Sequence, residues 1–186
     1  MNNESLTRAF NGELEVRSDG RTVVGLAVPW NTPTRVSDGG PAYLEAFDKG
    51  AFARTIVERG DRVKLLALHD SRRMPLGRVN LLREDTNGLY IEARVSNTRE
   101  GDEALELIRD GALDGLSIGF KPVRDLTRAG VVVRTEVRLN EVSAVSFPAY
   151  DDARIQAVRS FDQPQLIIAR RRLELARREN PFEKRK

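Results

Sequence analysis

The stretch Gly77-Arg-Val-Asn-Leu-Leu-Arg-Glu-Asp-Thr-Asn-Gly-Leu-Tyr-Ile-Glu-Ala-Arg-Val95 decides the fold. It contains two strand-like runs, Gly77–Arg83 and Leu89–Val95, on either side of a short polar segment that ends in Asn87-Gly88. Asn-Gly between two such runs is a strong signal for a tight hairpin turn. The stretch therefore predicts two antiparallel strands, on which the rest of a sheet can be built.

Similar patterns continue on both sides of this hairpin. Further strands are expected at Leu14–Arg17, Thr22–Val28, Val63–Leu68, Leu116–Val123, Val131–Val137 and Asn140–Phe147. Helices are expected at 48–59 with Asp48 as the N-cap, at 101–110, at 151–158, and at 164–179. The helices do not alternate regularly with the strands, which argues against a parallel doubly wound sheet. The prediction is a mainly β (α+β) fold, a small antiparallel, partly closed β-barrel surrounded by a few helices.

The domain organisation follows from the same patterns and from the distribution of charge. Residues 1–12 are expected to form a flexible leader, residues 13–160 the barrel domain, and residues 161–186 a basic helical tail. The segment 170–186 holds eight basic and three acidic side chains, a net charge of +5, whereas the remaining residues sum to −2. Such a tail can contact an acidic partner or nucleic acid through electrostatics, or it can be a solvated helix end.

Composition excludes several kinds of chemistry. The chain has no cysteine and one histidine, which rules out disulfides, thiolate nucleophiles, cysteine-rich zinc sites and multi-histidine metal sites. No calcium-loop pattern is present, so neither a metal nor another cofactor is expected. No apolar run approaches the length that crosses a bilayer, and the first residues do not resemble a signal peptide. We therefore expect a soluble intracellular protein that does not bind membranes.

The single histidine, His69, is the first candidate for acid–base chemistry. It ends the apolar run Val63–Leu68 and is followed directly by Asp70. Imidazole titrates near neutral pH, so this side chain can accept and return a proton in the cell. A hydrogen-bonded structural histidine at the end of a strand is the alternative.

Ser117 is the candidate nucleophile. It lies in Asp114-Gly-Leu-Ser-Ile-Gly-Phe120, between two glycines that allow close approach of a neighbouring chain. A serine hydroxyl is a weak nucleophile and needs an adjacent base. The alternative is an ordinary serine in an edge strand. Ser143 and Ser146 are rival nucleophiles, but they lack comparable glycine neighbours.

A catalytic base usually needs a third group to orient it, and Glu141 is the first candidate. It opens a strand of otherwise small and apolar residues, and the two-residue period of a strand places it on the same face as Ser143. The alternative is a surface salt-bridge residue. Asp70 is a second candidate, although neighbouring side chains in a strand point to opposite faces.

Four segments resemble the prohead (procapsid) maturation proteases of tailed bacteriophages, which are similar in fold to the herpesvirus assemblins. They carry the three candidate residues in the family's order and spacing over residues 13–158. The element Asp48-Lys-Gly-Ala-Phe52 also fits. The segments are Gly25–Asn31, Leu68–Asp70 with Pro75–Val79, Gly115–Phe120, and Glu141–Ala149.

The resemblance implies a serine endopeptidase with Ser117 as nucleophile, His69 as general base, and Glu141 in the place where assemblins use a second histidine. It implies cleavage of the scaffolding part of the major capsid protein, and of the protease itself, inside the procapsid in the host cytoplasm. Self-association, and contacts of the basic tail with an acidic scaffold or nucleic acid, are further expectations. The alternative is a non-enzymatic capsid assembly protein on the same fold.

Overall fold

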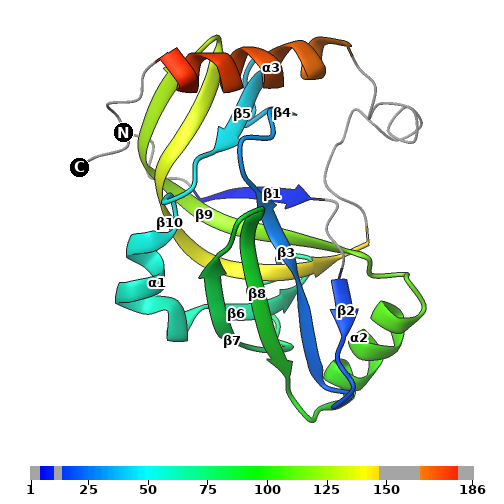
Figure 1. Ribbon diagram of the computed structural model, residues 1–186. Coiled ribbons are helices and arrows are strands. Elements are labelled where there is room, and N and C mark those ends of the chain that lie inside the picture. The colour runs from blue at the N-terminus through cyan, green and yellow to red at the C-terminus, as the bar shows by residue number, and fades with distance from the viewer. Residues whose placement is uncertain (1–4, 11–13, 147–163, 180–186) are drawn as a thin grey trace.

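The computed structural model describes residues 5–10, 14–146 and 164–179, and a curled ten-stranded sheet dominates them (Figure 1). The strand order is β1-β9-β10-β6-β7-β8-β3-β2, while β5 pairs with β10 and β4 pairs with β5. This architecture confirms the prediction of a mainly β, partly closed barrel with few helices. The strands are β1 (Leu6–Phe10), β2 (Leu14–Val16), β3 (Thr22–Pro29), β4 (Thr34–Val36), β5 (Tyr43–Phe47), β6 (Lys64–Ala67), β7 (Gly77–Glu84), β8 (Gly88–Val95), β9 (Gly115–Arg128) and β10 (Val131–Val145).

Three α-helices and one short 3-10 helix accompany the sheet: α1 (Ala53–Arg59), η1 (Gly60–Arg62), α2 (Arg99–Arg109) and α3 (Pro164–Glu179). Helix α2 begins where the Thr98 hydroxyl accepts a hydrogen bond from the Gly101 amide at 3.1 Å. Helix α1 has no side-chain cap. The prediction of Asp48 as its N-cap is wrong, because the helix begins at Ala53 and Phe52 occupies the N-cap position. The Asp48 carboxylate instead accepts a hydrogen bond from Arg128 at 2.9 Å. Within the described residues, no helix is both long and apolar enough to cross a membrane.

The hairpin that decides the fold is present as β7 and β8, paired antiparallel. Its turn is longer than the Asn-Gly pattern predicts, because Gly88 is already part of β8 and Asn87 has no positive φ. Gly88 is needed for a different reason. A Cβ atom at this position would lie 2.0 Å from the Val28 carbonyl oxygen of the adjacent strand β3. The glycine therefore permits close strand approach rather than the turn itself.

Strand β10 is the centre of the sheet. It pairs antiparallel with β9 along its whole length and parallel with both β5 and β6. The sequence predicts two strands here, 131–137 and 140–147, but residues 131–145 form one strand. Irregularities in the register near Arg134 and between Leu139 and Glu141 explain the difference. Such bulges interrupt the alternation of apolar residues without ending the strand. Residue 147 and the helix expected at 151–158 lie outside the described residues.

Aromatic and aliphatic side chains fill the interior of the curled sheet. The Phe47 ring stacks on Phe52 with centroids 5.7 Å apart and meets Phe120 edge-on at 5.3 Å. Phe120 and its neighbours Leu116 and Ile118 in β9 have no exposed surface. Alternate β9 residues therefore face the core, and the residues between them face the opposite side of the sheet.

The flexible leader expected at 1–12 is wrong for Leu6–Phe10. These residues form β1, which pairs antiparallel with β9 from Leu6 opposite Phe120 to Phe10 opposite Leu116. A buried ion pair holds β1 in place, since Arg8 Nε donates to Glu45 Oε2 of β5 at 2.6 Å. Arg134 Nε of β10 donates to the other Glu45 oxygen at 2.7 Å. The sequence pattern of β1 is short and could not reveal these distant partners.

We expect Glu45→Ala to lower the free energy of unfolding by about 3–5 kcal/mol, the usual cost of removing one partner from a buried ion pair. Glu45 is 1% exposed, so its loss leaves two arginines buried without their shared carboxylate. Guanidinium chloride denaturation measures the change. Glu103→Ala is the control because its exposed pair with Arg99 in α2 contributes about 1 kcal/mol or less. Equal losses in both variants would contradict the assignment of Glu45 as a structural anchor.

The basic helix expected at 164–179 is present as α3 and lies against the sheet (Figure 1). Ala169 and Leu173 are buried against Ala46 of β5 and against Val131 and Val133 of β10. These contacts form a second, smaller apolar cluster, separate from the barrel core. The α3 part of the tail is therefore attached to the sheet through an apolar face.

Candidate active site

The structure brings His69, Ser117 and Glu141 together, although they are far apart in the chain. The Nε2 atom of His69 lies 2.5 Å from the Ser117 hydroxyl oxygen. Its Nδ1 atom lies 2.6 Å from Oε1 of Glu141. The imidazole therefore bridges a serine and a carboxylate through its two ring nitrogens, in an unbroken hydrogen-bonded chain.

The strand pairing explains how these residues meet. Strand β10 lies between β9 and β6, with Ser143 opposite both Ser117 of β9 and Leu66 of β6. Glu141 lies opposite Gly119 on β9. Since paired residues on adjacent strands share a face, Ser117, Glu141 and Ser143 all lie on the side of the sheet away from the core.

His69 reaches this face through a turn rather than from a strand. Strand β6 ends at Ala67, and the next two residues adopt left-handed backbone conformations, with φ of 50° at Leu68 and 61° at His69. Such angles are uncommon outside glycine and are typical of functional sites held by their surroundings. The turn directs the imidazole back toward β9 and β10.

Ser143 holds the turn and the carboxylate at the same time. Its hydroxyl oxygen accepts a hydrogen bond from the His69 backbone N–H at 3.1 Å. The same hydroxyl donates to Oε2 of Glu141 at 2.7 Å. The sequence indicates Ser143 only as a rival nucleophile. Its position on the same strand face as Glu141 is the signal that could reveal contact with that carboxylate. The other rival, Ser146, has no recorded hydrogen bond to His69 or Glu141.

Asp70 does not contact the imidazole. Its carboxylate accepts hydrogen bonds from the backbone N–H of Arg72 at 3.1 Å and from the Arg72 guanidinium at 3.4 Å. The backbone hydrogen bond from Arg72 is the main cause that lowers the pKa of Asp70. The carboxylate that orients His69 in this geometry is therefore Glu141.

Gly119 leaves the space that the Glu141 carboxylate occupies. A Cβ atom at residue 119 would lie 2.2 Å from Oε1 of Glu141, the oxygen that contacts the imidazole. The glycines around Ser117 were expected to let a neighbouring backbone approach. At Gly119 the approaching group is instead the Glu141 side chain.

Gly119→Ala is expected to slow phosphonylation of Ser117 by a serine-reactive fluorophosphonate probe by roughly 100-fold. Displacement of Glu141 by about an ångström misaligns His69, and a misplacement of about 1 Å can lower a reaction rate by roughly 100-fold. Gly115→Ala is the matched control, because its Cβ would meet no atom closer than Val145 Cγ2 at 3.2 Å. Mass spectrometry of the labelled protein gives both rates. An unchanged rate for Gly119→Ala, in a variant that melts normally, would refute this role of the glycine.

The serine of the site is buried, whereas the imidazole and the carboxylate are partly exposed. Ser117 and Ser143 have no exposed surface, whereas the side chains of His69 and Glu141 are 23% and 15% exposed. The Ser117 hydroxyl is therefore covered by other atoms of the protein in this structure. Across the described part of the chain, no three acidic, histidine or cysteine side chains are grouped to hold a metal ion. The arrangement is suited to proton transfer from serine to imidazole, with the carboxylate stabilising the resulting imidazolium.

Two known proteins are similar to this chain, one in sequence and one in fold. The chain is 28% identical over 122 residues to the prohead protease of Enterobacteria phage HK97, a match that covers 63% of this chain and 54% of that protein. The chain thus spans about half the length of this relative. In fold it is similar to the bacteriophage T4 capsid assembly protease, with a TM-score of 0.50, 16% identity, and coverage of 78% of this chain and 98% of that one.

The family comparison covers the chain from just before β2 to the first residues of α3. Residues 12–165 match the model of a family described as caudovirus prohead serine protease. This range contains the three residues of the hydrogen-bonded chain and all four segments on which the resemblance rests. The chain belongs to the caudovirus prohead serine protease family.

Proposed function

We propose that this chain is a serine endopeptidase in which Ser117 is the nucleophile, His69 the general base and Glu141 the carboxylate that orients the base. The observation that carries the proposal is the unbroken contact from the Ser117 hydroxyl through His69 to Glu141. Serine needs an adjacent base, and the base needs a partner that fixes its tautomer. Membership of a serine protease family supports the same reaction.

The catalytic steps follow from the two ring nitrogens of His69. Glu141 accepts the Nδ1 proton, which leaves Nε2 unprotonated and facing the Ser117 hydroxyl. As the serine oxygen attacks a peptide carbonyl, Nε2 takes its proton and later gives it to the departing amine. Backbone N–H groups stabilise the oxyanion. Water activated by the same nitrogen then releases the acyl group and regenerates Ser117.

The proposed substrate is the scaffolding part of the major capsid protein, together with the protease itself. The support is the family match and the names of two similar proteins, a prohead protease and a capsid assembly protease. Cleavage takes place inside the procapsid in the host cytoplasm, where protease and scaffold are enclosed together. The capsid protein is thus the main partner. The basic tail, which continues beyond α3, is proposed as a segment that contacts the scaffold and is removed by self-cleavage.

Mass spectrometry of two purified chains tests the proposal. The wild type and Ser117→Ala are each expressed with and without the major capsid protein of the same phage. We expect the wild type alone to shorten the capsid protein and to lose mass from its own C-terminal end. Normal processing of the capsid protein by Ser117→Ala would refute the proposed nucleophile. Intact masses in every sample, with normal shell assembly, would favour the non-enzymatic assembly protein instead.

A further inference from the structure

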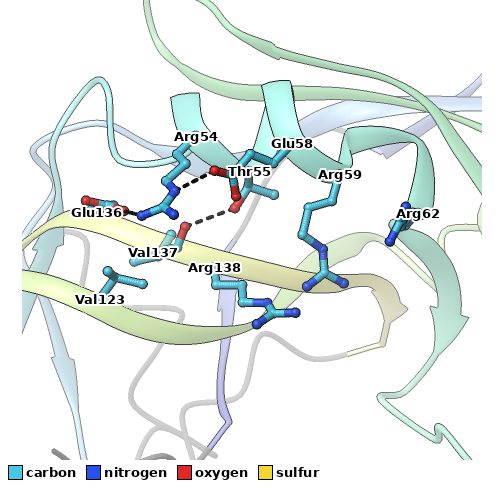
Figure 2. A pocket seen from close by; sticks show the side chains of 9 residues that line it. All are labelled: Arg54, Thr55, Glu58, Arg59, Arg62, Val123, Glu136, Val137 and Arg138. Atoms are coloured by element: carbon cyan, nitrogen blue, oxygen red, sulfur yellow. Dashed lines mark hydrogen bonds and ion pairs between the residues drawn. The ribbon is translucent and has the colours of Figure 1, made fainter.

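A second candidate site is a pocket of about 430 Å³ between α1, η1 and the strands β9 and β10, and none of His69, Ser117 and Glu141 lines it (Figure 2). Four arginines and two glutamates line it, with Val123 and Val137 as apolar walls. Arg54 forms ion pairs with both glutamates, with Glu58 at 2.8 Å and with Glu136 at 3.1 Å. The chemistry of the pocket therefore depends on the three other arginines.

Arg59, Arg62 and Arg138 have no ion pair or side-chain hydrogen bond with any other residue that the structure describes. The Nε atom of Arg59 is moreover buried without an acceptor. Figure 2 shows the guanidinium groups of Arg59 and Arg138 directed into the same space below α1. Buried donors are almost always paired in folded proteins, and neighbouring cations repel each other. An anionic group in this space would satisfy the buried donor and offset the repulsion.

The pocket is close to the proposed catalytic residues along two strands. Arg138 precedes Glu141 by three residues in β10. Arg62 lies two residues before Lys64 of β6, and Lys64 pairs with Glu141. Because the register is irregular between them, Arg138 lies opposite Lys121 of β9 and Glu141 lies opposite Gly119, only two residues apart. At about 3.3 Å per residue this is roughly 7 Å along the strand, which about two residues of extended polypeptide bridge.

We propose that this pocket binds an acidic stretch of the polypeptide substrate, a few residues away from the bond that is cleaved. Arginine pairs with carboxylates through two parallel hydrogen bonds, which suits three guanidiniums without partners. The apolar walls can contact the rest of a peptide. A nucleic acid fits less well, because its phosphate backbone would leave the apolar walls Val123 and Val137 without contacts.

That the bound peptide is a substrate rests on the proposed protease function, whereas binding of an acidic peptide does not. Binding can be measured without cleavage in full-length Ser117→Ala protein. The probes are a short fluorescent peptide with consecutive glutamates and its twin with glutamine at the same positions. We expect the glutamate peptide to bind at least about tenfold more tightly, as one or two charge-assisted hydrogen bonds provide. This preference should weaken with salt.

Arg62→Gln/Arg138→Gln in the same background should abolish most of that preference. Arg62→Lys/Arg138→Lys should retain part of it, because lysine keeps the charge but not the paired geometry. The control Arg35→Gln/Arg99→Gln removes the same charge from exposed positions in β4 and α2, and should leave the preference intact. Thermal melting confirms that each variant folds, and Arg138→Gln alone replaces the double variant if that one does not.

Three results would overturn the inference. The first is equal binding of the two peptides, and the second is a preference that survives Arg62→Gln/Arg138→Gln. The third is tighter binding of a single-stranded DNA of equal charge that depends on the same arginines, which would identify a nucleic-acid site. The glutamate preference can behave as expected while the wild type cleaves neither peptide nor capsid protein. That result would support the pocket as an acidic-peptide site and would refute the proposed protease function.

Discussion

Ser117→Ala is expected to lower kcat/KM for peptide cleavage by roughly 10⁴-fold or more, with the fold retained. The hydroxyl is the only atom of the site that forms the acyl bond in the proposed mechanism, and His69 has no other proton to take from the protein at that position. Removing a small buried hydroxyl leaves the strand pairing of β9 unchanged, so stability should change little. The effect is therefore a loss of chemistry rather than of structure.

Initial rates on a peptide that spans a mapped capsid cleavage site measure this loss. His69→Ala should be impaired to a similar extent, and the double variant should be scarcely worse than either single one, because the two residues act as a unit. Ser146→Ala is the matched control, since this serine lies near the site in sequence but outside the hydrogen-bonded chain. Substantial activity in Ser117→Ala, or its loss in Ser146→Ala, would require a different nucleophile.

Glu141→Gln is expected to lower kcat/KM by up to about 10⁴-fold. The amide keeps the size of the side chain but loses the negative charge that stabilises the imidazolium. It can also donate its N–H to Nδ1, which would place the ring proton on Nε2, the atom that must accept the proton of Ser117. Both changes act on the same step of the reaction.

Two further substitutions test whether Glu141 or Asp70 orients His69. Asp70→Asn should leave kcat/KM nearly unchanged, because the Asp70 carboxylate faces Arg72. Ser143→Ala should have an intermediate effect of about tenfold or more, through loss of one hydrogen bond to a charged group. Full activity of Glu141→Gln together with a strong loss in Asp70→Asn would transfer the orienting role to Asp70. Full activity of both would indicate a serine–histidine dyad.

The sequence allowed prediction of the fold class and of the three residues that meet. The strand runs, the Asn-Gly segment and the lack of helix alternation were sufficient for a partly closed barrel. Ser117, His69 and Glu141 could be singled out because each stands in an unusual local setting. The resemblance to a protease family then linked them, and that family assignment is confirmed.

Other features depend on contacts that no local pattern records. The approach of the His69 imidazole to Glu141 depends on the left-handed turn at Leu68 and His69, which no residue pattern in Val63–Asp70 predicts. The position of β1 follows from the burial of Arg8 against Glu45, across 37 residues of chain. The role of Ser143 follows from a register that places it opposite Ser117. Each is a tertiary effect that overrides what the local sequence favours.

The central place of β10 sets the order in which the proposed catalytic site is completed during synthesis. A nascent chain that has emerged as far as Phe120 already contains Ser117 and His69, but it lacks Glu141 and Ser143. It also lacks the strand that lies between β6 and β9, so nothing sets the spacing between those two strands. Among the elements of the site, β10 is synthesised last, and it supplies both the Glu141 carboxylate and the Ser143 hydroxyl that contacts the His69 turn. Under the proposed mechanism, cleavage therefore begins only after β10 has been translated and has paired with β6 and β9.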